Sequence, residues 1–245
     1  MSDLATSPRI FVDAGLAAGD LVLDADRSHY LIRVMRRKPG DVLRLFNGRD
    51  GEWSATVDAA DKRACRLAVK RQTRSQADVP DIWHCFAPIK KSPLDYLVEK
   101  ATELGVRRLC PVLTDRTENR RVNTGRLAEV AREAAEQCEC LAVPAIAEPV
   151  GLAGLLAAWP AGRTLFFLDE TRDARPLAAE ASARAGCPAA LITGPEGGFT
   201  PAERRLLLEH PTAVPCSLGP RLLRAETAAA AALAIWQSVA GDLAD

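Results

Sequence analysis

Two glycine-containing loops in the C-terminal half hold most of the residues of this chain that could do chemistry. In the first, residues 191–200 (LITGPEGGFT), an apolar strand ends and a glycine loop follows. A helix is expected to begin after Thr200, which can form a capping box with Glu203. The second, residues 217–227 (SLGPRLLRAET), precedes an alanine-rich helix expected over residues 227–239. Because glycine lets a ligand approach the backbone closely, the two loops are expected to form one binding site.

The type of ligand is limited by what these loops lack. Either loop alone would be compatible with an ordinary strand-to-helix connection. Neither has the glycine spacing of a dinucleotide-binding loop or the Gly-Lys-Ser/Thr end of a phosphate loop, and the carboxylate of Glu196 disfavours a polyphosphate. A flavin or nicotinamide enzyme is therefore the least favoured interpretation.

The same residues carry a family resemblance. The loops at residues 193–199 and 218–228, together with residues 100–106 (KATELGV), resemble the ribosomal RNA small subunit methyltransferase E family of the SPOUT class. The resemblance extends over nearly the whole chain. It implies a mainly parallel α/β domain with a trefoil knot that binds S-adenosylmethionine, preceded by a small β-rich PUA-like domain. It also implies a homodimer that methylates uridine N3 in 16S ribosomal RNA, either free or within the small ribosomal subunit. Composition and periodicity alone do not indicate a knot.

The resemblance assigns cofactor binding to three loops, which begin near residues 168, 193 and 217. Small residues there would let the backbone reach the edge of the adenine, and three leucines could pack on its faces. Each leucine, taken alone, could equally belong to the core. The expected cofactor-binding residues are Leu168, Thr193, Gly194, Glu196, Gly197, Gly198, Leu218, Gly219 and Leu223.

Methylation at uridine N3 requires that its proton leaves, so the site should stabilise a uracil anion or accept the proton. Arg221 and Arg224 are the candidates to stabilise the charge on the uracil oxygens. Glu226 or Glu196 could accept the proton, although Glu226 is also favoured in a first helical turn by the helix dipole alone.

The sequence is also compatible with two other functions. A ribose 2′-O-methyltransferase would use the same cofactor fold but attack through a sugar hydroxyl. An RNA-binding ribosome-assembly protein would retain only a vestigial cofactor pocket, an interpretation that the intact glycines of both loops disfavour.

Charge divides the sequence into two halves. Residues 1–128 contain 23 Lys and Arg against 17 Asp and Glu, a net charge of +6, whereas residues 129–245 contain 9 against 15, a net charge of −6. RNA is therefore expected to contact the first half, with chance asymmetry of a solvated surface as the alternative. The expected RNA-binding residues are Arg9, Arg33, Arg36, Lys90 and Lys91, and Arg116, Arg120 and Arg121 form a further basic cluster.

Composition favours a cytoplasmic protein. No apolar run approaches the ~20 residues of a membrane helix, and the N-terminus lacks the features of a signal peptide. Seven cysteines without metal-ligand spacing are typical of reduced thiols, and Cys138 and Cys140 have no nearby histidine, so no metal site is expected. Many relatives carry an arginine at position 140; if it holds RNA or the dimer, that role has moved or is missing here.

The elements expected around the site form two domains. Residues 1–72 are expected to form the PUA-like domain, with strands at 9–12, 42–46, 52–57 and 65–69 and a basic helix at 26–35. Residues 73–245 alternate strands (82–86, 107–113, 164–168, 189–193) with helices, the first capped by Ser92-Pro93 and the next two at 124–137 and 174–185. Such alternation predicts a mainly parallel sheet with ligands beyond its carboxyl ends, where both glycine loops and Asp169-Glu170 lie.

Overall fold

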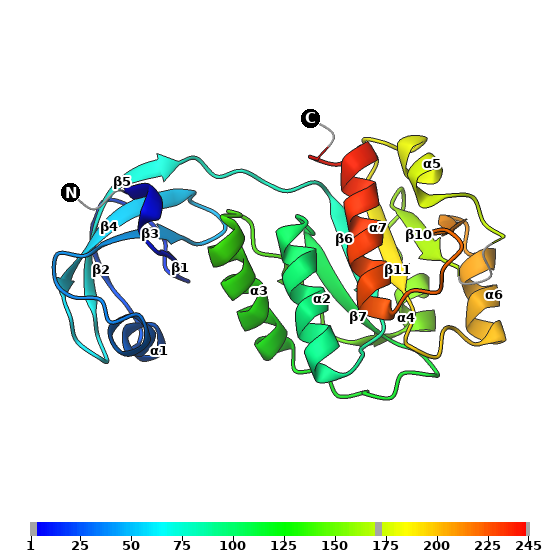
Figure 1. Ribbon diagram of the computed structural model, residues 1–245, viewed down its shortest axis with the longest axis horizontal. Helices are drawn as coiled ribbons and strands as arrows, with labels where there is room; N and C mark the ends of the chain where they lie inside the picture. Colours follow the sequence, from blue (N-terminus) through cyan, green and yellow to red (C-terminus); the bar gives the residue numbers. More distant parts are fainter. Residues whose placement is uncertain (1–3, 170–172, 244–245) are drawn as a thin grey trace. The chain divides into compact units, whose positions relative to one another are not determined.

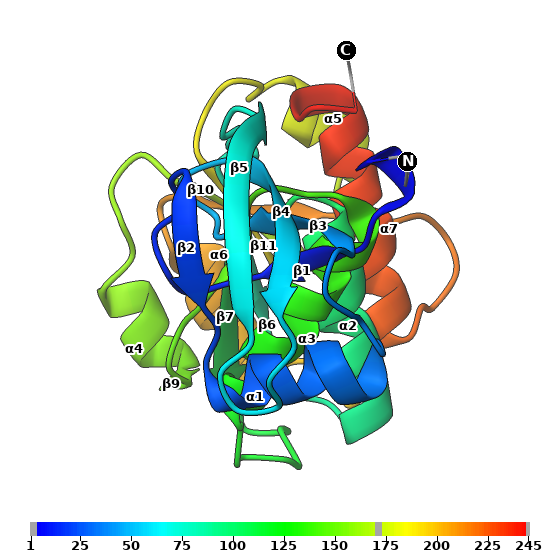
Figure 2. The ribbon, with the colours of Figure 1, turned by 90° about the vertical axis from the view of Figure 1, so that its left-hand side faces the viewer.

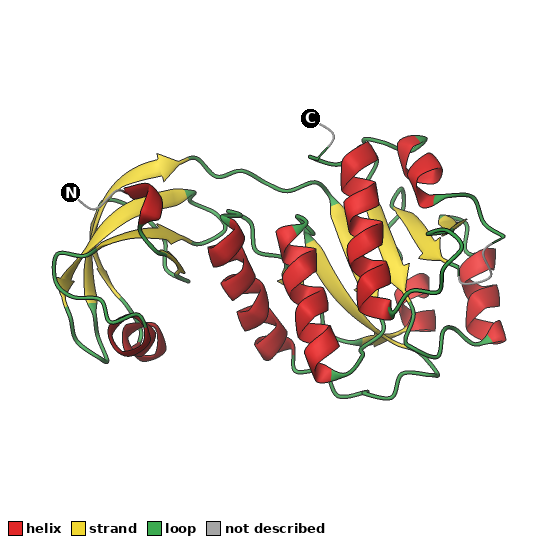
Figure 3. Ribbon diagram, in the orientation of Figure 1, coloured by secondary structure: helices red, strands yellow, loops and turns green. Residues whose placement is uncertain are grey.

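The chain folds into two compact units. The structure, a computed structural model, describes residues 4–169 and 173–243 (Figure 1). Its contacts group Met1–Asp78 with Ala135–Val143, and Val79–Ala134 with Pro144–Asp245. The boundary expected after residue 72 falls inside strand β5 (Arg66–Arg74), so the units divide only after that strand has ended. The first unit consists mainly of strands, whereas the second alternates strands and helices (Figure 3).

The first unit is built on a five-stranded sheet in the order β1-β3-β4-β5-β2. Its strands are β1 (Arg9–Phe11), β2 (Gly19–Val22), β3 (Val42–Phe46), β4 (Glu52–Ala59) and β5. Strand β1 pairs parallel with β3, and the other neighbours are antiparallel. Alternate side chains of the strands, such as Leu43, Leu45, Val57 and Leu67, are buried in one apolar core.

The turn between β3 and β4 requires a glycine. Asn47 Oδ1 accepts hydrogen bonds from the N–H groups of Arg49 and Asp50, which closes the turn. Gly51 has a φ of 75°, and a Cβ at this position would lie 2.2 Å from the carbonyl oxygen of Arg74. The glycine of this Asp-Gly pair is thus needed for both its backbone conformation and its contact with β5.

The basic segment after β2 is helical but less regular than expected. A short helix, α1 (Ala25–His29), begins at Asp24, whose side chain accepts the N–H of Arg27, and continues as a single π-helical turn over Tyr30–Val34. It ends near Arg36, which has a φ of 54°. Leu31 faces the core, while Arg33 and Arg36 are exposed.

Arg9 is a structural residue, which corrects its expected role in RNA binding. It is only 5% exposed, its Nε donates to Glu52 Oε2 at 2.8 Å, and its guanidinium lies 4.2 Å from the ring centre of Phe46. Its two terminal nitrogens donate to the carbonyl oxygens of Ala135, Glu136 and Cys140. Arg9 therefore holds the end of helix α3 (Thr124–Cys138) against the sheet, and its side chain is buried rather than exposed for RNA.

The second unit contains a seven-stranded sheet whose paired strands run parallel. Its order is β12-β10-β11-β6-β7-β8, and β9 also pairs with β7. The strands are β6 (Ile82–Phe86), β7 (Arg108–Leu113), β8 (Ala145–Ile146), β9 (Val150–Gly151), β10 (Thr164–Leu168), β11 (Ala189–Thr193) and β12 (Ala213–Cys216). The expected fold class, a mainly parallel α/β domain joined to a β-rich N-terminal domain, is confirmed. The trefoil knot stays a prediction.

Helices cover both faces of this sheet (Figures 1 and 2). Helices α2 (Lys91–Glu103), α5 (Leu177–Ser182) and α7 (Ala225–Ala240) pack together on one face, whereas α4 (Leu152–Ala157) and α6 (Pro201–Glu209) lie on the other. The N-cap of α2 is Lys90, two residues before the expected cap at Ser92, so Ser92 and Pro93 lie inside its first turn. In the part of the chain that the structure describes, no helix is long and apolar enough to cross a membrane.

Candidate functional site

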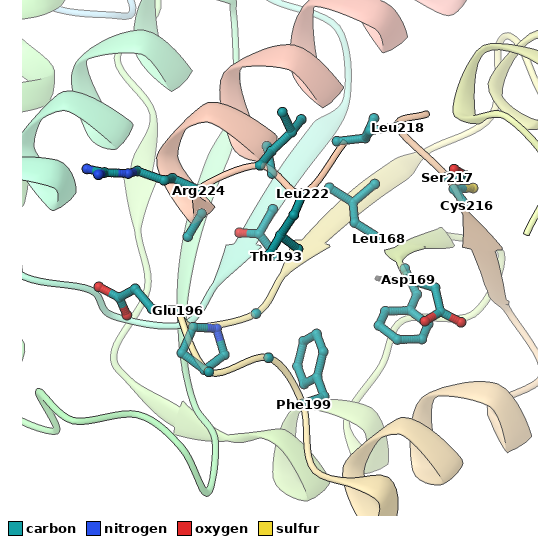
Figure 4. Close-up of a pocket in the computed structure, with 18 of the residues that line it drawn as sticks. Leu168, Asp169, Thr193, Glu196, Phe199, Cys216, Ser217, Leu218, Leu222 and Arg224 are labelled. Carbon is teal, nitrogen blue, oxygen red and sulfur yellow. The ribbon is translucent and has the colours of Figure 1, made fainter. Parts of the chain in front are cut away.

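Three loops meet beyond the carboxyl ends of β10, β11 and β12. Because these strands are parallel and adjacent in the sheet, their following loops leave it at the same edge. The loops and the start of α7 enclose a cavity of about 370 Å³ within the second unit. Leu168, Thr193, Leu218 and Leu222 extend along it, with Glu196 and Arg224 on one side and Asp169 and Cys216 on the other (Figure 4).

The loop after β11 is held in a tight conformation. Gly198 has a φ of 68°, and its N–H donates to the carbonyl oxygen of Pro195 at 2.9 Å. Phe199 lies against the loop, with its Cε2 atom 2.9 Å from where a Cβ of Gly194 would be. The loop ends at the capping box of α6: Thr200 Oγ1 accepts the N–H of Glu203, and the Glu203 carboxylate accepts the N–H of Thr200.

The loop after β12 leads directly to the N-terminus of α7. Gly219 has a φ of 98°, and its N–H donates to the hydroxyl of Ser217. Within the described residues, no hydrogen bond engages the backbone N–H of Leu218 or of Leu223. Helix α7 begins after Arg224, which provides no side-chain cap, and its small residues Ala225 and Ala228 line the cavity. One wall of the cavity thus contains two backbone N–H groups that are free to donate hydrogen bonds, and the N-terminus of a helix.

An ion pair lies in the opposite wall. Asp169 directly follows β10 and is buried; its carboxylate accepts two hydrogen bonds from Arg204, at 3.2 Å from Nε and 2.6 Å from Nη2. This bidentate pair joins the end of β10 to helix α6. The hydrogen bond to Asp169 raises the pKa of Arg204, which therefore stays charged.

Behind the cavity, a buried histidine contacts Thr193. Nε2 of His84, on β6, lies 3.1 Å from the hydroxyl of Thr193, and its Nδ1 has no hydrogen-bond partner among the residues that the structure describes. Burial lowers the pKa of His84 to about 3, so the imidazole is neutral at physiological pH. The hydrogen bond fixes the side chain of Thr193 on the face of the sheet that α7 covers.

All of the residues expected to bind a cofactor line the cavity. They are Leu168, Thr193, Gly194, Glu196, Gly197, Gly198, Leu218, Gly219 and Leu223. Arg221 and Arg224 line it as well and are exposed. Glu226 does not line the cavity, because successive helical residues are rotated by about 100° and the cavity-facing positions of α7 are 225 and 228. The catalytic role of Glu226 stays a prediction.

Some residues that line the cavity were not predicted from the sequence. Phe167, Phe199, Arg204, Cys216, Ala225 and Ala228 also contribute to the wall. Ala225 and Ala228 are three residues apart in the first turn of α7, which begins two residues before the expected helix start at residue 227, so helical periodicity could have found them together only with the correct start. Arg204 carried no such signal, since its partner Asp169 precedes it by 35 residues. Glu170, expected at this strand end, lies outside the described residues.

The remaining candidates for RNA binding are exposed. Arg33 and Arg36 lie in the first unit, and Lys90 and Lys91 lie at the start of α2, after the carboxyl end of β6. Since β6 is the neighbour of β11, these lysines leave the sheet at the same edge as the cavity loops. Their role in RNA binding stays a prediction.

Comparisons with known proteins agree with this arrangement. A family model described as an RNA methyltransferase domain matches residues 76–237, and one described as an RNA methyltransferase PUA domain matches residues 23–70. The ribosomal RNA small subunit methyltransferase E of Rickettsia conorii is 32% identical over 228 residues, which cover 92% of this chain and 93% of that protein. Its namesake from a Synechocystis species is 31% identical over 218 residues, covering 87% and 71%.

Solved structures show the same likeness over both units. A putative methyltransferase from Legionella pneumophila in complex with the bound cofactor SAM has a TM-score of 0.87 and 27% identity, covering 96% of this chain and 99% of that one. A ribosomal RNA small subunit methyltransferase E from Neisseria gonorrhoeae bound to S-adenosyl methionine has a TM-score of 0.88 and 25% identity, covering 97% and 99%.

Proposed function

The chain belongs to the ribosomal RNA small subunit methyltransferase E family, and on that premise we propose that it methylates N3 of a uridine in 16S ribosomal RNA, with S-adenosylmethionine as the methyl donor. The family supports the donor and the class of RNA. The atom that is methylated is the finer part of the proposal. The observation that carries it is that Arg221 and Arg224 line the same cavity as the expected cofactor loops.

The residues of the cavity fit this donor. Its volume of about 370 Å³ lies within the range of small-molecule sites. The unpaired N–H groups of Leu218 and Leu223 can donate to the edge of an adenine, and Leu168, Leu218 and Leu223 supply apolar walls. When bound, S-adenosylmethionine supplies an electrophilic methyl group on a positively charged sulfur.

The arginines are proposed to act on the uracil. As the proton leaves N3, negative charge spreads to the two neighbouring oxygens, and an exposed guanidinium can donate to either of them. Arg224 lies at the N-terminus of α7, whose dipole adds to the same positive field. Glu196 is exposed on the same side of the cavity as Arg224 (Figure 4) and is the proposed acceptor of the proton, ahead of Glu226.

The methylated atom is tested by product analysis. Purified protein is incubated with methyl-labelled S-adenosylmethionine and either unmodified small ribosomal subunits or deproteinised 16S ribosomal RNA, and the RNA is digested to nucleosides. Label in 3-methyluridine supports the proposal, and the better substrate shows whether assembled structure is required. Label in a ribose-methylated nucleoside would overturn the assignment to N3. No label in either RNA would favour the RNA-binding alternative.

The role of Arg221 is tested separately from binding. Arg221→Ala is expected to lower kcat about 10²-fold to 10³-fold, the usual cost of losing one donor to a developing anion. Its affinity for S-adenosylmethionine should change little, since the guanidinium is assigned to the uracil. Arg205, exposed on α6 and outside the cavity lining, provides the matched control Arg205→Ala. Near-normal turnover of Arg221→Ala would remove Arg221 from the mechanism.

Two further features are proposed from the family resemblance. The protein is expected to act as a homodimer in the cytoplasm, where it meets ribosomal subunits. Sedimentation at micromolar concentration tests whether the protein is a dimer, and a result showing only monomer would contradict this expectation.

A further inference from the structure

The loop that follows β7 supports the cofactor cavity from outside. This loop, residues 114–121 and here called the β7 loop, leaves the same edge of the sheet as the loops of the cavity. It begins with a compact turn, in which Thr117 Oγ1 accepts the N–H of Thr114 and also lies 2.8 Å from its hydroxyl. Thr114 and Thr117 are both buried, so this turn restricts the positions of the two residues between them, Asp115 and Arg116.

One side of the β7 loop is attached to the start of α6. The N–H of Asp115 donates to Glu203 Oε1 at 2.8 Å. The other oxygen of Glu203 accepts the N–H and the hydroxyl of Thr200. Through Glu203, the β7 loop is therefore linked to the end of the loop that lines the cavity.

Arg116 makes a second attachment at the centre of that cavity loop. Its Nη1 donates to the carbonyl oxygen of Gly197 at 2.6 Å, and its Cδ lies 3.4 Å from where a Cβ of Gly197 would be. Gly197 lines the cavity, whereas Arg116 does not. Arg116 can thus influence the position of a cofactor loop without contacting the cofactor.

The β7 loop is largely exposed and carries three arginines beside two acidic residues, Asp115 and Glu118. Arg116, Arg120 and Arg121 are all exposed, and in the described part of the chain the bond to Gly197 is the only hydrogen bond of Arg116. An arginine has five N–H donors in a planar fork, so the remaining donors of Arg116 suit the oxygens of a phosphate. Arg120 uses one nitrogen to donate to the carbonyl oxygen of Thr114.

We propose that Arg116 couples the two ligands of this protein, by binding a phosphate of the substrate RNA with one side of its guanidinium while the other side holds the Gly197 carbonyl of the cofactor loop. This inference rests on the proposed function. The coupling is positive, because an exposed arginine loses side-chain entropy when it holds Gly197. A phosphate that fixes the same guanidinium offsets that cost, so the cofactor loop becomes better ordered when RNA is bound.

The test measures the affinity of S-adenosylhomocysteine, which cannot donate a methyl group, in the absence and presence of saturating deproteinised 16S ribosomal RNA. Equilibrium dialysis with the wild-type chain is expected to show about 5-fold or greater tightening by RNA, the lower end of typical coupling. Arg116→Gln should abolish this tightening. Arg121→Gln, in the same loop but without a bond to Gly197, should bind RNA more weakly and keep the tightening at saturating RNA.

The ratio of the two dissociation constants separates coupling from a general loss of structure. A poorly folded variant would lose affinity in both conditions, whereas loss of coupling removes only their difference, and thermal denaturation confirms that each variant is folded. Equal affinities with and without RNA in the wild-type chain, or an unchanged ratio in Arg116→Gln, would overturn the inference. Neither result depends on which atom is methylated, so product analysis tests the proposed function independently.

Discussion

Gly194→Ala should weaken cofactor binding through one steric contact. The added Cβ would lie 2.9 Å from Cε2, 3.2 Å from Cδ2 and 3.4 Å from Cζ of Phe199, so the ring has to move by about half an ångström to reach ordinary contact. The ring cannot move freely, because it packs edge-to-face on buried Phe167 with 5.4 Å between ring centres. Overpacking of this kind costs about 1–3 kcal/mol. If the loop moves instead, the same free energy appears as a loss of affinity for S-adenosylmethionine of about 5-fold to 150-fold.

Calorimetric titration of S-adenosylmethionine into wild type and Gly194→Ala measures this loss, and urea denaturation measures any accompanying loss of stability. Gly197→Ala is the matched control. It lies in the same loop, and its added Cβ would meet only side-chain atoms of exposed Arg116, at the ordinary contact distances of 3.4 Å (Cδ), 3.6 Å (Cβ) and 4.0 Å (Cγ). We expect the control to bind within about 3-fold of wild type. Wild-type affinity and stability in Gly194→Ala would refute the argument that Phe199 fixes this loop.

Three further predictions concern stability. Arg9→Met leaves the buried carboxylate of Glu52 without its closest cation, and is expected to lower the free energy of unfolding of the first unit by about 3–5 kcal/mol in native-state hydrogen exchange; exposed Arg66→Met should change it by less than about 0.5 kcal/mol. Thr200→Ala removes the side-chain cap of α6 and should cost about 0.5–2 kcal/mol in urea denaturation. The folded-state pKa of His84, about 3, is lower than its usual 6.5, so below pH 6.5 protons bind preferentially to the unfolded chain. Between pH 7 and pH 5 the free energy of unfolding of wild type should therefore fall by about 2 kcal/mol more than that of His84→Gln. Equal decreases for the two proteins in urea denaturation would contradict this linkage.

Local features of the fold were predictable from sequence. The capping box at Thr200 depends on residues three apart, and it forms as predicted. The strands Ile82–Phe86, Thr164–Leu168 and Ala189–Thr193 have the predicted bounds, because each is a short apolar run between polar or turn-forming residues. The site loops could be placed together because parallel strands leave their following loops at the same edge.

Features that depend on distant contacts were not predictable. Arg9 cannot be distinguished from a surface arginine in the sequence. It is buried because the end of helix α3 packs against it, through a contact with Ala135, 126 residues later in the chain. The position of Glu226 relative to the cavity was not predictable for a different reason. Its place in the first turn of α7 was correct, but the rotation of that helix, which decides which side chains face the cavity, is set by packing against the sheet.

The central claim is that the loops after β10, β11 and β12 bind S-adenosylmethionine, and hydrogen exchange measured with and without the cofactor tests it most directly. The free N–H groups of Leu218 and Leu223 are expected to donate hydrogen bonds to the cofactor and so to exchange more slowly when it is bound. Added S-adenosylmethionine should slow exchange in peptides covering residues 193–199 and 217–225, while the strands β3 and β4 of the first unit remain unchanged. Unchanged exchange in both peptides at saturating cofactor, or protection confined to another part of the chain, would contradict the account.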